Sequence, residues 1–323
     1  MRVVIIGGSG HVGTFLVPRL VEAGYEVINV SRGKSGPYHP HAAWRQVRQV
    51  SIDRQKAEAE GVFGERIKEL QPDVVIDMIC FTLKSAKQLV QALKGQVQHF
   101  LLCGTIWVHG PSVEVPVTED APRRPFGEYG IQKAAIEAYL LEQARKEGFP
   151  ATVLHPGHIV GPGWEPINPT GHRSLWVFEA LAKGEELLLP NLGMETLHHV
   201  HADDVAQAFF KALTHWGGAV GESFHVVSPR AVTLRGYAER VASWFGQEAK
   251  LRFLPFEEWK RVAARNEEEI RLTSDHILHS PNCSIAKAQK LIDYQPRYSS
   301  FQAVYEALVW LAEHGRIQVP PLR

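Results

Sequence analysis

The hydrophobic positions in the first half of the chain form short β-branched runs that alternate with longer amphipathic segments. The runs predict strands over residues 2–6, 26–30, 46–50, 73–79, 97–103 and 151–155. The segments between them predict helices over residues 11–23, 56–70, 82–93 and 127–147. Apolar runs without polar alternation are typical of parallel strands that are covered on both faces. Repeated β-α units of this length therefore predict an α/β fold with a doubly wound parallel sheet and right-handed crossovers.

This rhythm breaks at Gly157, where a segment rich in Gly, Pro, Asn and Trp begins and continues to Met194. The elements expected after the break are a helix over 174–183, a strand and helix within 197–213, a strand over 222–227, and helices over 233–245, 256–269 and 300–314. We expect Asp203 or Asp204 to cap the helix within 197–213, because a carboxylate accepts from free N–H groups of a first helical turn.

The turn after the first predicted strand carries the pattern G-x-x-G-x-x-G at Gly7, Gly10 and Gly13. Glycines in this pattern allow a tight turn, a close approach of the backbone to a pyrophosphate, and packing of the next helix against the sheet. The N–H groups at the start of that helix favour phosphate binding. Because the motif lies between a strand and a helix, we predict a dinucleotide site that also includes His11 and Val12.

The choice of dinucleotide depends on the end of the second predicted strand. A site that prefers NAD offers a carboxylate to the ribose hydroxyls there, but this chain has Ser31, Arg32 and, close behind, Lys34. A small residue followed by arginine suits the 2′-phosphate of NADP, whereas an arginine that only stacks on adenine suits either cofactor. We therefore favour NADP over NAD, with Asp53 hydrogen-bonded to the adenine amino group.

Tyr129 and Lys133 are four residues apart on a predicted helix and therefore share a face. A nearby cation favours phenolate, so Lys133 is expected to lower the pKa of Tyr129 and prepare it for acid/base work. Thr105 follows the strand predicted over 97–103, 24 residues before Tyr129. Its hydroxyl either joins substrate and tyrosine in a proton-transfer site or satisfies its own backbone. We favour the catalytic role.

Composition excludes several classes of function. The chain has 323 residues with 35 basic and 35 acidic side chains, and this neutral balance argues against nucleic acid or anionic membranes as partners. A strand predicted from residue 2 leaves no room for a signal peptide, and Cys80, Cys103 and Cys283 form no C-x-x-C pair, so a cytoplasmic location is expected. The His/Asp cluster at 198–204 is interpreted as polar packing and a helix cap, so no metal is expected.

Together these motifs resemble the extended short-chain dehydrogenases/reductases of the NAD-dependent epimerase/dehydratase family. The matching segments are G-G-S-G-H-V-G from Gly7, Asp53, Thr105, Tyr129 with Lys133, P-G-H-I-V-G-P-G from Pro156, H-A-D-D-V-A from His201, and residues 284–312. The resemblance implies a Rossmann sheet, a nicotinamide cofactor and a homodimer. It also implies a catalytic trio of Thr105, Tyr129 and Lys133, with Lys133 and Pro156 in the cofactor site.

We therefore predict a dinucleotide-binding Rossmann domain of residues 1–157, continued by 198–228. Residues 158–197 and 229–323 are predicted to form a smaller α/β substrate-binding lobe at the C-terminal side of the sheet.

Departures from the family narrow the substrate. Dehydratases have Asp-Glu after the catalytic Thr, where this chain has Ile106 and Trp107, so water elimination lacks its proton carriers. Leu197 stands where relatives have an arginine that clamps a nucleotide-sugar diphosphate, and an arginine of another loop, such as Arg173, is the alternative clamp. His158 replaces an Asn common in sugar epimerases, and His109 replaces a Tyr. Expected substrate contacts are His158, Trp164 and Trp176.

The sequence thus predicts an NAD(P)-dependent oxidoreductase or epimerase that acts on an alcohol or carbonyl of a small polar molecule, with sugar derivatives included. The alternative is a non-catalytic NAD(P)-sensing regulatory protein, but the Tyr-Lys pair argues against it. An RNA-binding relative of the same fold is disfavoured by the neutral charge.

Overall fold

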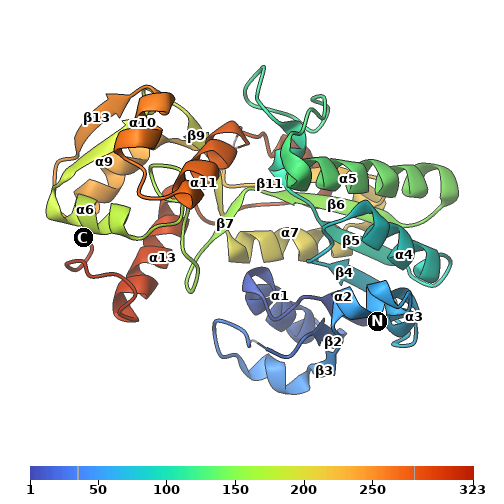
Figure 1. The fold of residues 1–323 in the computed structure, drawn as a ribbon. Coiled ribbons are helices and arrows are strands. Elements are labelled where there is room, and N and C mark those ends of the chain that lie inside the picture. The colour runs from blue at the N-terminus through green and yellow to red at the C-terminus, as the bar shows by residue number, and fades with distance from the viewer. Residues whose placement is uncertain (35, 280) are drawn as a thin grey trace.

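A computed structural model describes residues 1–34, 36–279 and 281–323, and its larger lobe is built on a seven-stranded parallel sheet (Figure 1). The strand order is β11-β6-β5-β4-β1-β2-β3. The strands are β1 (Arg2–Ile6), β2 (Glu26–Ser31), β3 (Arg48–Ser51), β4 (Val74–Asp77), β5 (His99–Cys103), β6 (Ala151–Pro156) and β11 (Ser223–Val226). Every neighbouring pair runs parallel, which confirms the predicted doubly wound α/β class.

Both faces of this sheet are covered, because successive strand side chains point to opposite sides. In β1, Val3 and Ile5 pack with one group of helices, whereas Val4 and Ile6 pack with another. The first group comprises α1 (His11–Glu22), α7 (Ala202–Thr214), α8 (Trp216–Ala219) and α12 (Ala286–Ile292). The second comprises α2 (Arg54–Ala59), α3 (Phe63–Lys68), α4 (Leu83–Leu93) and α5 (Gly127–Glu147). The result is a three-layer α/β/α arrangement.

Two predicted helices are each broken in two. The helix predicted over 56–70 is α2 and α3, separated by a turn in which Gly61 has φ +75°, a left-handed conformation that ends a helix. The helix predicted over 256–269 is α10 (Phe256–Val262) and α11 (Glu267–Leu278), because the Asn266 side chain accepts from the N–H of Glu269 and starts a new helix.

The smaller lobe lies to the left in Figure 1 and has its own hydrophobic core. Its helices are α6 (Trp176–Lys183), α9 (Leu234–Trp244), α10, α11 and α13 (Ser300–Glu313). Its paired strands are β8 (Glu186–Pro190) with β13 (Lys250–Leu254), β9 (Thr196–Leu197) with β12 (Val232–Thr233), and β7 (His158–Val160) with β10 (His199–His201). Within the range predicted for this lobe, α12 packs against the larger sheet instead, where Ala288 and Ile292 join its core.

The cap of α7 differs from the prediction. The His201 side chain accepts from the N–H of Asp203, so His201 is the N-cap and the two aspartates lie in the first turn. Asp203 forms ion pairs with Arg19 and Arg297. The Asp204 carboxylate accepts from the N–H groups of Arg297 (2.8 Å) and Tyr298 (3.1 Å). These carboxylates therefore attach the segment before α13 to α7.

Candidate active site

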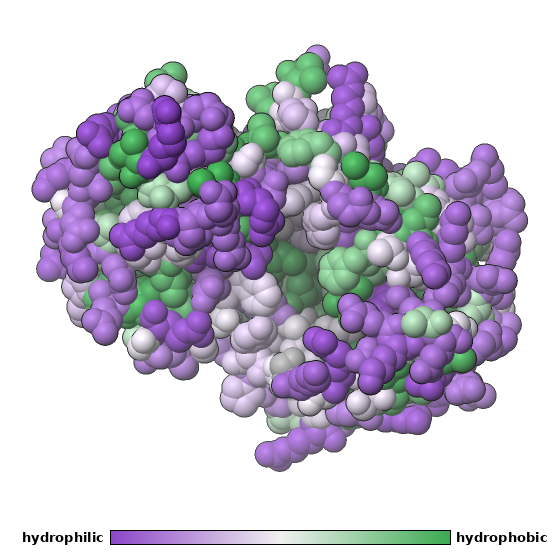
Figure 2. Space-filling view, in the orientation of Figure 1, coloured by the Kyte–Doolittle hydropathy of each residue, from purple (hydrophilic) through white to green (hydrophobic). Residues whose placement is uncertain are grey.

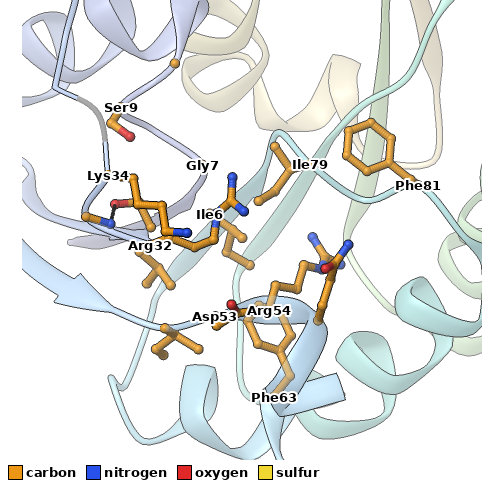
Figure 3. Close-up of a pocket in the computed structure, with 16 residues that line it drawn as sticks. Ile6, Gly7, Ser9, Arg32, Lys34, Asp53, Arg54, Phe63, Ile79 and Phe81 are labelled. Atoms are coloured by element: carbon orange, nitrogen blue, oxygen red, sulfur yellow. Dashed lines mark hydrogen bonds between the residues drawn. The ribbon is translucent and has the colours of Figure 1, made fainter. Parts of the chain in front are cut away.

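A pocket of about 330 Å³ opens at the carboxyl ends of β1, β2 and β4 (Figure 3). The strand order reverses between β1 and β4, and ligands of open parallel sheets bind in the crevice at this point. The lining residues are Ile6, Gly7, Ser9, Gly10, Val30, Ser31, Arg32, Gly33, Lys34, Ile52, Asp53, Arg54, Gln55, Phe63, Ile79 and Phe81. Apolar walls with a cationic rim suit an adenine nucleotide.

The glycine turn forms one side of this pocket, and its glycines have different tasks. A Cβ at Gly13 would lie 1.8 Å from the carbonyl oxygen of Gly8, so only glycine allows α1 to pack this closely on the turn. A Cβ at Gly10 would meet nothing nearer than 3.5 Å, so the protein itself leaves this space open. No side chain caps α1, and its first turn has no acidic residue. The turn therefore fits a dinucleotide pyrophosphate.

The end of β2 places cations at the rim of the pocket. Arg32 and Lys34 are exposed and line it, and the Ser31 hydroxyl accepts from the N–H of Gly33 at 3.1 Å. Asp53 also lines the pocket, where its carboxylate caps α2 by accepting from the N–H of Lys56.

Arg54 is a pocket residue that the sequence analysis missed. Its guanidinium binds both carboxylate oxygens of Asp77 (2.8 and 3.0 Å) and Glu58 (2.6 Å), and lies 5.0 Å from the centre of the Phe63 ring. Burial alone would lower the pKa of Arg54, but Asp77 outweighs it and the pKa is raised. Asp77 is the last residue of β4, and no sequence pattern indicates that its carboxylate binds Arg54.

The other predicted cofactor residues, His11, Val12 and Pro156, lie in different environments. His11 lies at the start of α1, stacked on Trp164 at 4.8 Å with Tyr38 edge-on, and burial lowers its pKa to about 4. Val12 belongs to the hydrophobic core. Pro156 is the buried last residue of β6. Trp164, predicted as a substrate contact, thus lies beside the glycine turn.

The structure brings Thr105, Tyr129 and Lys133 together. The Thr105 hydroxyl lies beside the phenol of Tyr129, and it accepts from the N–H of Trp107 at 3.3 Å. The backbone contact considered for Thr105 is therefore present, and its catalytic role stays a prediction. The Lys133 ammonium is buried, donates to the carbonyl of Cys103 at 2.7 Å, and lies 5.1 Å from the centre of the Phe81 ring. Phe81 also lines the dinucleotide pocket, so the trio adjoins it.

The pKa of Tyr129 differs in direction from the expectation. Desolvation of its hydroxyl raises the pKa, and the Thr105 hydroxyl beside it only partly opposes this. Lys133 lies 5.7 Å from the centre of the tyrosine ring and donates to the Cys103 carbonyl instead of the phenol oxygen. Burial also lowers the pKa of Lys133. In the cofactor-free protein Tyr129 is therefore a protonated phenol at neutral pH.

Aromatic rings extend from Tyr129 toward the smaller lobe. Trp107 lies edge-on to Tyr129 (5.5 Å between ring centres) and to His276 (5.5 Å), and His276 lies 5.0 Å from His158. Burial, then the neighbouring His276, hold the pKa of His158 well below its usual range. Figure 2 shows the surface hollowed between the two lobes, with hydrophobic residues at the bottom. His158 is thus connected to Tyr129 through the rings of His276 and Trp107. Trp107 and His276 were not predicted as substrate contacts.

The remaining predicted substrate positions lie farther into the smaller lobe. The Trp176 indole donates to Glu269 at 3.0 Å and is covered by the Arg265 guanidinium at 3.8 Å. Leu197 is fully buried in the core of that lobe, and Arg173 is exposed.

Two further features concern metals and membranes. Within the described ranges, no group of three or more His, Cys, Asp or Glu side chains is arranged to hold a metal ion. Instead, His199 contacts the carbonyl of Ile167 and His198 that of Ser228. None of the helices in the described parts of the chain combines the length and the apolar character needed to cross a bilayer.

Comparisons with known proteins agree with this geometry. The chain is 26% identical over 317 residues to the 2'-dehydrokanamycin reductase of Streptomyces kanamyceticus, which covers 98% of this chain and 86% of the relative. It is 24% identical over 278 residues to a UDP-glucose 4-epimerase of Mycolicibacterium smegmatis, which covers 79% and 86%.

Among solved structures, UDP-glucuronic acid 4-epimerase from Bacillus cereus, in complex with UDP-glucuronic acid and NAD, has the same fold. Its TM-score is 0.72 at 17% identity, over 97% of this chain and 100% of that one. Residues 3–226 match the NAD dependent epimerase/dehydratase family. With the glycine turn, the parallel sheet and the Thr-Tyr-Lys trio in place, this chain belongs to the NAD-dependent epimerase/dehydratase family of enzymes.

Proposed function

We propose that this enzyme transfers a hydride at an alcohol or carbonyl carbon of a small polar, sugar-derived molecule, with Tyr129 as the acid/base. The observation that carries the proposal is the placement of the Thr105 hydroxyl beside the phenol of Tyr129, with the Lys133 ammonium buried next to them at the edge of the pocket formed by the glycine turn. A phenol paired with a second hydroxyl is suited to hold one substrate oxygen and move one proton at it.

Each member of the trio has one task in this scheme. A bound nicotinamide cofactor supplies or accepts the hydride. The Thr105 hydroxyl orients the substrate oxygen, and the Tyr129 phenol donates the proton that this oxygen takes up in reduction. In oxidation the same tyrosine oxygen accepts the proton. Lys133 is proposed to hold a ribose hydroxyl of the cofactor and to favour the phenolate when Tyr129 has given up its proton.

Reduction of a carbonyl is the direction that we favour. The raised pKa of Tyr129 keeps the phenol protonated at neutral pH, which is the form that donates. The reductase relative from Streptomyces kanamyceticus spans almost the whole of this chain. An epimerase is the second candidate, supported by the similarity to UDP-glucose 4-epimerases, and would return the hydride to the opposite face of the same carbon.

We further propose that NADP(H) is preferred over NAD(H), because Arg32 and Lys34 line the pocket where an NAD site offers a carboxylate. Calorimetric titration with NADPH and NADH measures this preference. Arg32→Ala should weaken NADPH on the order of 10-fold and leave NADH nearly unchanged, as loss of one charged phosphate contact does. Equal affinities for both cofactors, together with no effect of Arg32→Ala, would refute a phosphate-binding role.

A nucleotide-sugar substrate is not part of this proposal. Leu197 is buried in the smaller lobe, and no charged side chain stands at that position to clamp a diphosphate. Arg173, which is exposed on another loop, is the alternative arginine that could take this role. Calorimetry with UDP and dTDP tests the point, and micromolar binding of either, in competition with substrate and not with cofactor, would overturn it.

The proposed activity is tested by following the absorbance of reduced cofactor with a panel of keto-sugars and oxidised aminoglycosides. Turnover of any of these compounds would support the proposed oxidoreductase activity. Tight cofactor binding without turnover of ketone, alcohol or epimerisable sugar would favour the NAD(P)-sensing alternative. We also propose a homodimer, for which sedimentation in solution is the check.

A further inference from the structure

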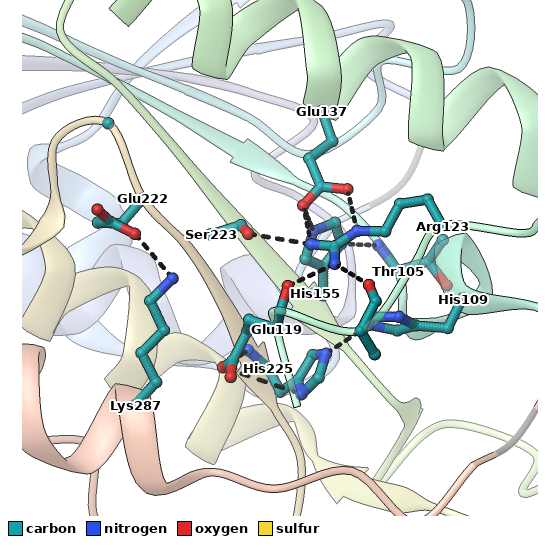
Figure 4. Close-up of polar contacts among 12 residues, drawn as sticks. Thr105, His109, Glu119, Arg123, Glu137, His155, Glu222, Ser223, His225 and Lys287 are labelled. Carbon is teal, nitrogen blue, oxygen red and sulfur yellow. Dashed lines mark hydrogen bonds and ion pairs between the residues drawn. The ribbon is translucent and has the colours of Figure 1, made fainter. Parts of the chain in front are cut away.

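A buried polar network lies behind Thr105 and joins three elements of the sheet lobe (Figure 4). The backbone N–H of Thr105 donates to Nδ1 of His155, in β6, at 3.0 Å. Nε2 of the same ring lies 3.0 Å from Oε1 of Glu137, in α5. Arg123 binds that carboxylate from the other side, through contacts of 2.6 and 3.0 Å.

These contacts fix where the proton on His155 must be. An N–H group can donate to a ring nitrogen only if that nitrogen carries no hydrogen, so Nδ1 must be bare when Thr105 donates to it. The ring proton then sits on Nε2, which lies 3.0 Å from Oε1 of Glu137, although the angle falls short of a regular hydrogen bond. The opposite tautomer would place two hydrogens between His155 and the Thr105 backbone.

Glu137 is equipped to enforce this tautomer, because it stays charged. Its side chain is only 3% exposed, and the Arg123 guanidinium donates to both of its carboxylate oxygens, which favours the charged carboxylate. Arg123 is itself anchored by donating to the carbonyls of Glu119 and Ala121. Buried ion pairs of this kind contribute little net stability compared with apolar packing, so stability alone does not explain the network.

The position of Glu137 on α5 links the network to the trio. Tyr129, Lys133 and Glu137 are spaced four residues apart, so they lie along one face of the helix. Each reaches the end of β5: Tyr129 lies beside the Thr105 hydroxyl, Lys133 donates to the Cys103 carbonyl, and Glu137 reaches the Thr105 N–H through His155.

The backbone at Gly104 restricts the position of the His155 ring. A Cβ at Gly104 would lie 2.4 Å from Nδ1 of His155, so the imidazole packs directly on the backbone that carries Thr105. A ring that turned or shifted would move that backbone with it.

We propose that Glu137 is a positioning residue, which sets the tautomer of His155 and thereby holds Thr105 in register with Tyr129. The inference rests on the proposed function for its effect on turnover, but its structural part can be tested without a substrate. Glu137 and His155 do not touch the reacting atoms. They act through the Thr105 backbone, and a misplaced catalytic group costs rate even when every reacting side chain is present.

The structural test is nitrogen NMR of ¹⁵N-histidine-labelled protein at neutral pH, with the His155 signals assigned from their loss in His155→Phe. The expected result is a bare Nδ1 and a protonated Nε2. Glu137→Gln offers one acceptor where glutamate has two, so in either amide orientation an N–H faces a donor of Arg123 or His155. We expect the variant to lose the pure Nε2–H signature and to speed hydrogen exchange at the Thr105 amide. An Nδ1–H tautomer in the unmodified protein would overturn the inference whether or not any variant folds.

The catalytic test compares variants with one substrate. Glu137→Gln should lower kcat on the order of 10- to 100-fold while KM for the cofactor changes little. His155→Asn, which keeps an acceptor for the Thr105 N–H, should retain more turnover than His155→Phe. Glu142→Gln is the matched control, because it makes the same change in an exposed pair with Lys146 on the same helix. Unchanged kcat in Glu137→Gln would contradict the positioning role. A failure of the unmodified protein to turn over any substrate would sink the proposed function, and the tautomer would still decide the structural claim.

Discussion

At the scale of single residues, two glycines of one motif have separable tasks. Gly13 makes the contact between α1 and the turn possible, since its Cβ would lie 1.8 Å from a carbonyl oxygen. Gly10 has room for a side chain within the protein and is open toward the pocket that it lines. One motif therefore contains one glycine needed for packing and one that keeps space for a ligand.

This difference predicts opposite outcomes for two substitutions. Gly10→Val should leave the thermal unfolding midpoint of the free protein nearly unchanged but abolish the stabilisation that NADPH provides, because the side chain fills the space for the pyrophosphate. Gly13→Ala should destabilise the free protein by more than about 2 kcal/mol through overpacking. Differential scanning fluorimetry with and without cofactor measures both. Full cofactor stabilisation in Gly10→Val would refute the assignment of the site.

The pKa of Tyr129 shows a limit of arguing from residue spacing. Four-residue spacing correctly placed Lys133 on the same helix face as Tyr129, but spacing contains no information on desolvation. In the folded chain desolvation of the hydroxyl raises the tyrosine pKa, and the lysine donates to a backbone carbonyl. The expectation that Lys133 lowers this pKa is therefore wrong for the cofactor-free protein.

At the scale of elements, several side chains of α7 hold the segment before α13, and the buried carboxylate of Asp204 is one of them. Asp204 accepts from two backbone N–H groups, those of Arg297 and Tyr298. Asp204→Ala leaves both backbone donors, which belong to an exposed and a half-buried residue, without this acceptor. We expect the free energy of unfolding to fall by about 1–3 kcal/mol, the cost of roughly one unsatisfied donor. Urea unfolding measures the loss. Asp293→Ala, which removes an exposed pair with Lys211, is the control, and equal losses in the two variants would contradict the prediction.

The elements that the sequence predicted best are those whose pattern depends on their own residues. The apolar runs of β1, β2 and β6 and the long helix α5 lie within a residue or so of the predicted ranges. Of the short strands of the smaller lobe, β10 was predicted, whereas the others and helix α12 were missed because their contact partners are distant in the sequence. The cap of α7 was misassigned, since His201 accepts from the N–H of Asp203 in place of a carboxylate cap.

Residues of the candidate site were likewise predictable only where a local sequence pattern marks them. The glycine turn, Arg32, Asp53 and the trio stand in recognisable local contexts. Arg54 and His155 act through partners on other strands, Asp77 and the Thr105 backbone, which no local pattern connects to them. Contacts between sequence-distant segments need the folded topology.

At the scale of the whole molecule, buried histidines make the fold sensitive to acid. Burial is the main cause that lowers the pKa to about 4 for His11, His99, His198 and His276, and to about 3 for His109, His199 and His201. In the unfolded chain these side chains bind protons below about pH 6.5, whereas the folded chain excludes them until much lower pH. Stability is therefore complete above the unfolded pKa and is lost as pH falls toward the folded values.

We expect cooperative unfolding at a pH well above 4, because a shift of two pKa units is worth about 3 kcal/mol per histidine and total stability is only about 5–15 kcal/mol. Circular dichroism along a pH titration measures the midpoint. His99→Gln removes one titrating ring and keeps a polar partner for Thr152, so its midpoint should lie at lower pH. A protein that stays folded at pH 4 would show that these histidines do not control its acid stability.

The activity assigned to the whole molecule depends on one proton transfer, and Tyr129→Phe removes only the oxygen that performs it. The most direct measurement is kcat for carbonyl reduction by the unmodified enzyme, Tyr129→Phe and Lys133→Met, with NADPH affinity determined in parallel. Tyr129→Phe should lower kcat by about 10²- to 10⁴-fold with cofactor affinity nearly intact, whereas Lys133→Met should weaken both. Turnover by Tyr129→Phe close to that of the unmodified enzyme would show that the proton comes from another group, and Tyr129 would not be the acid.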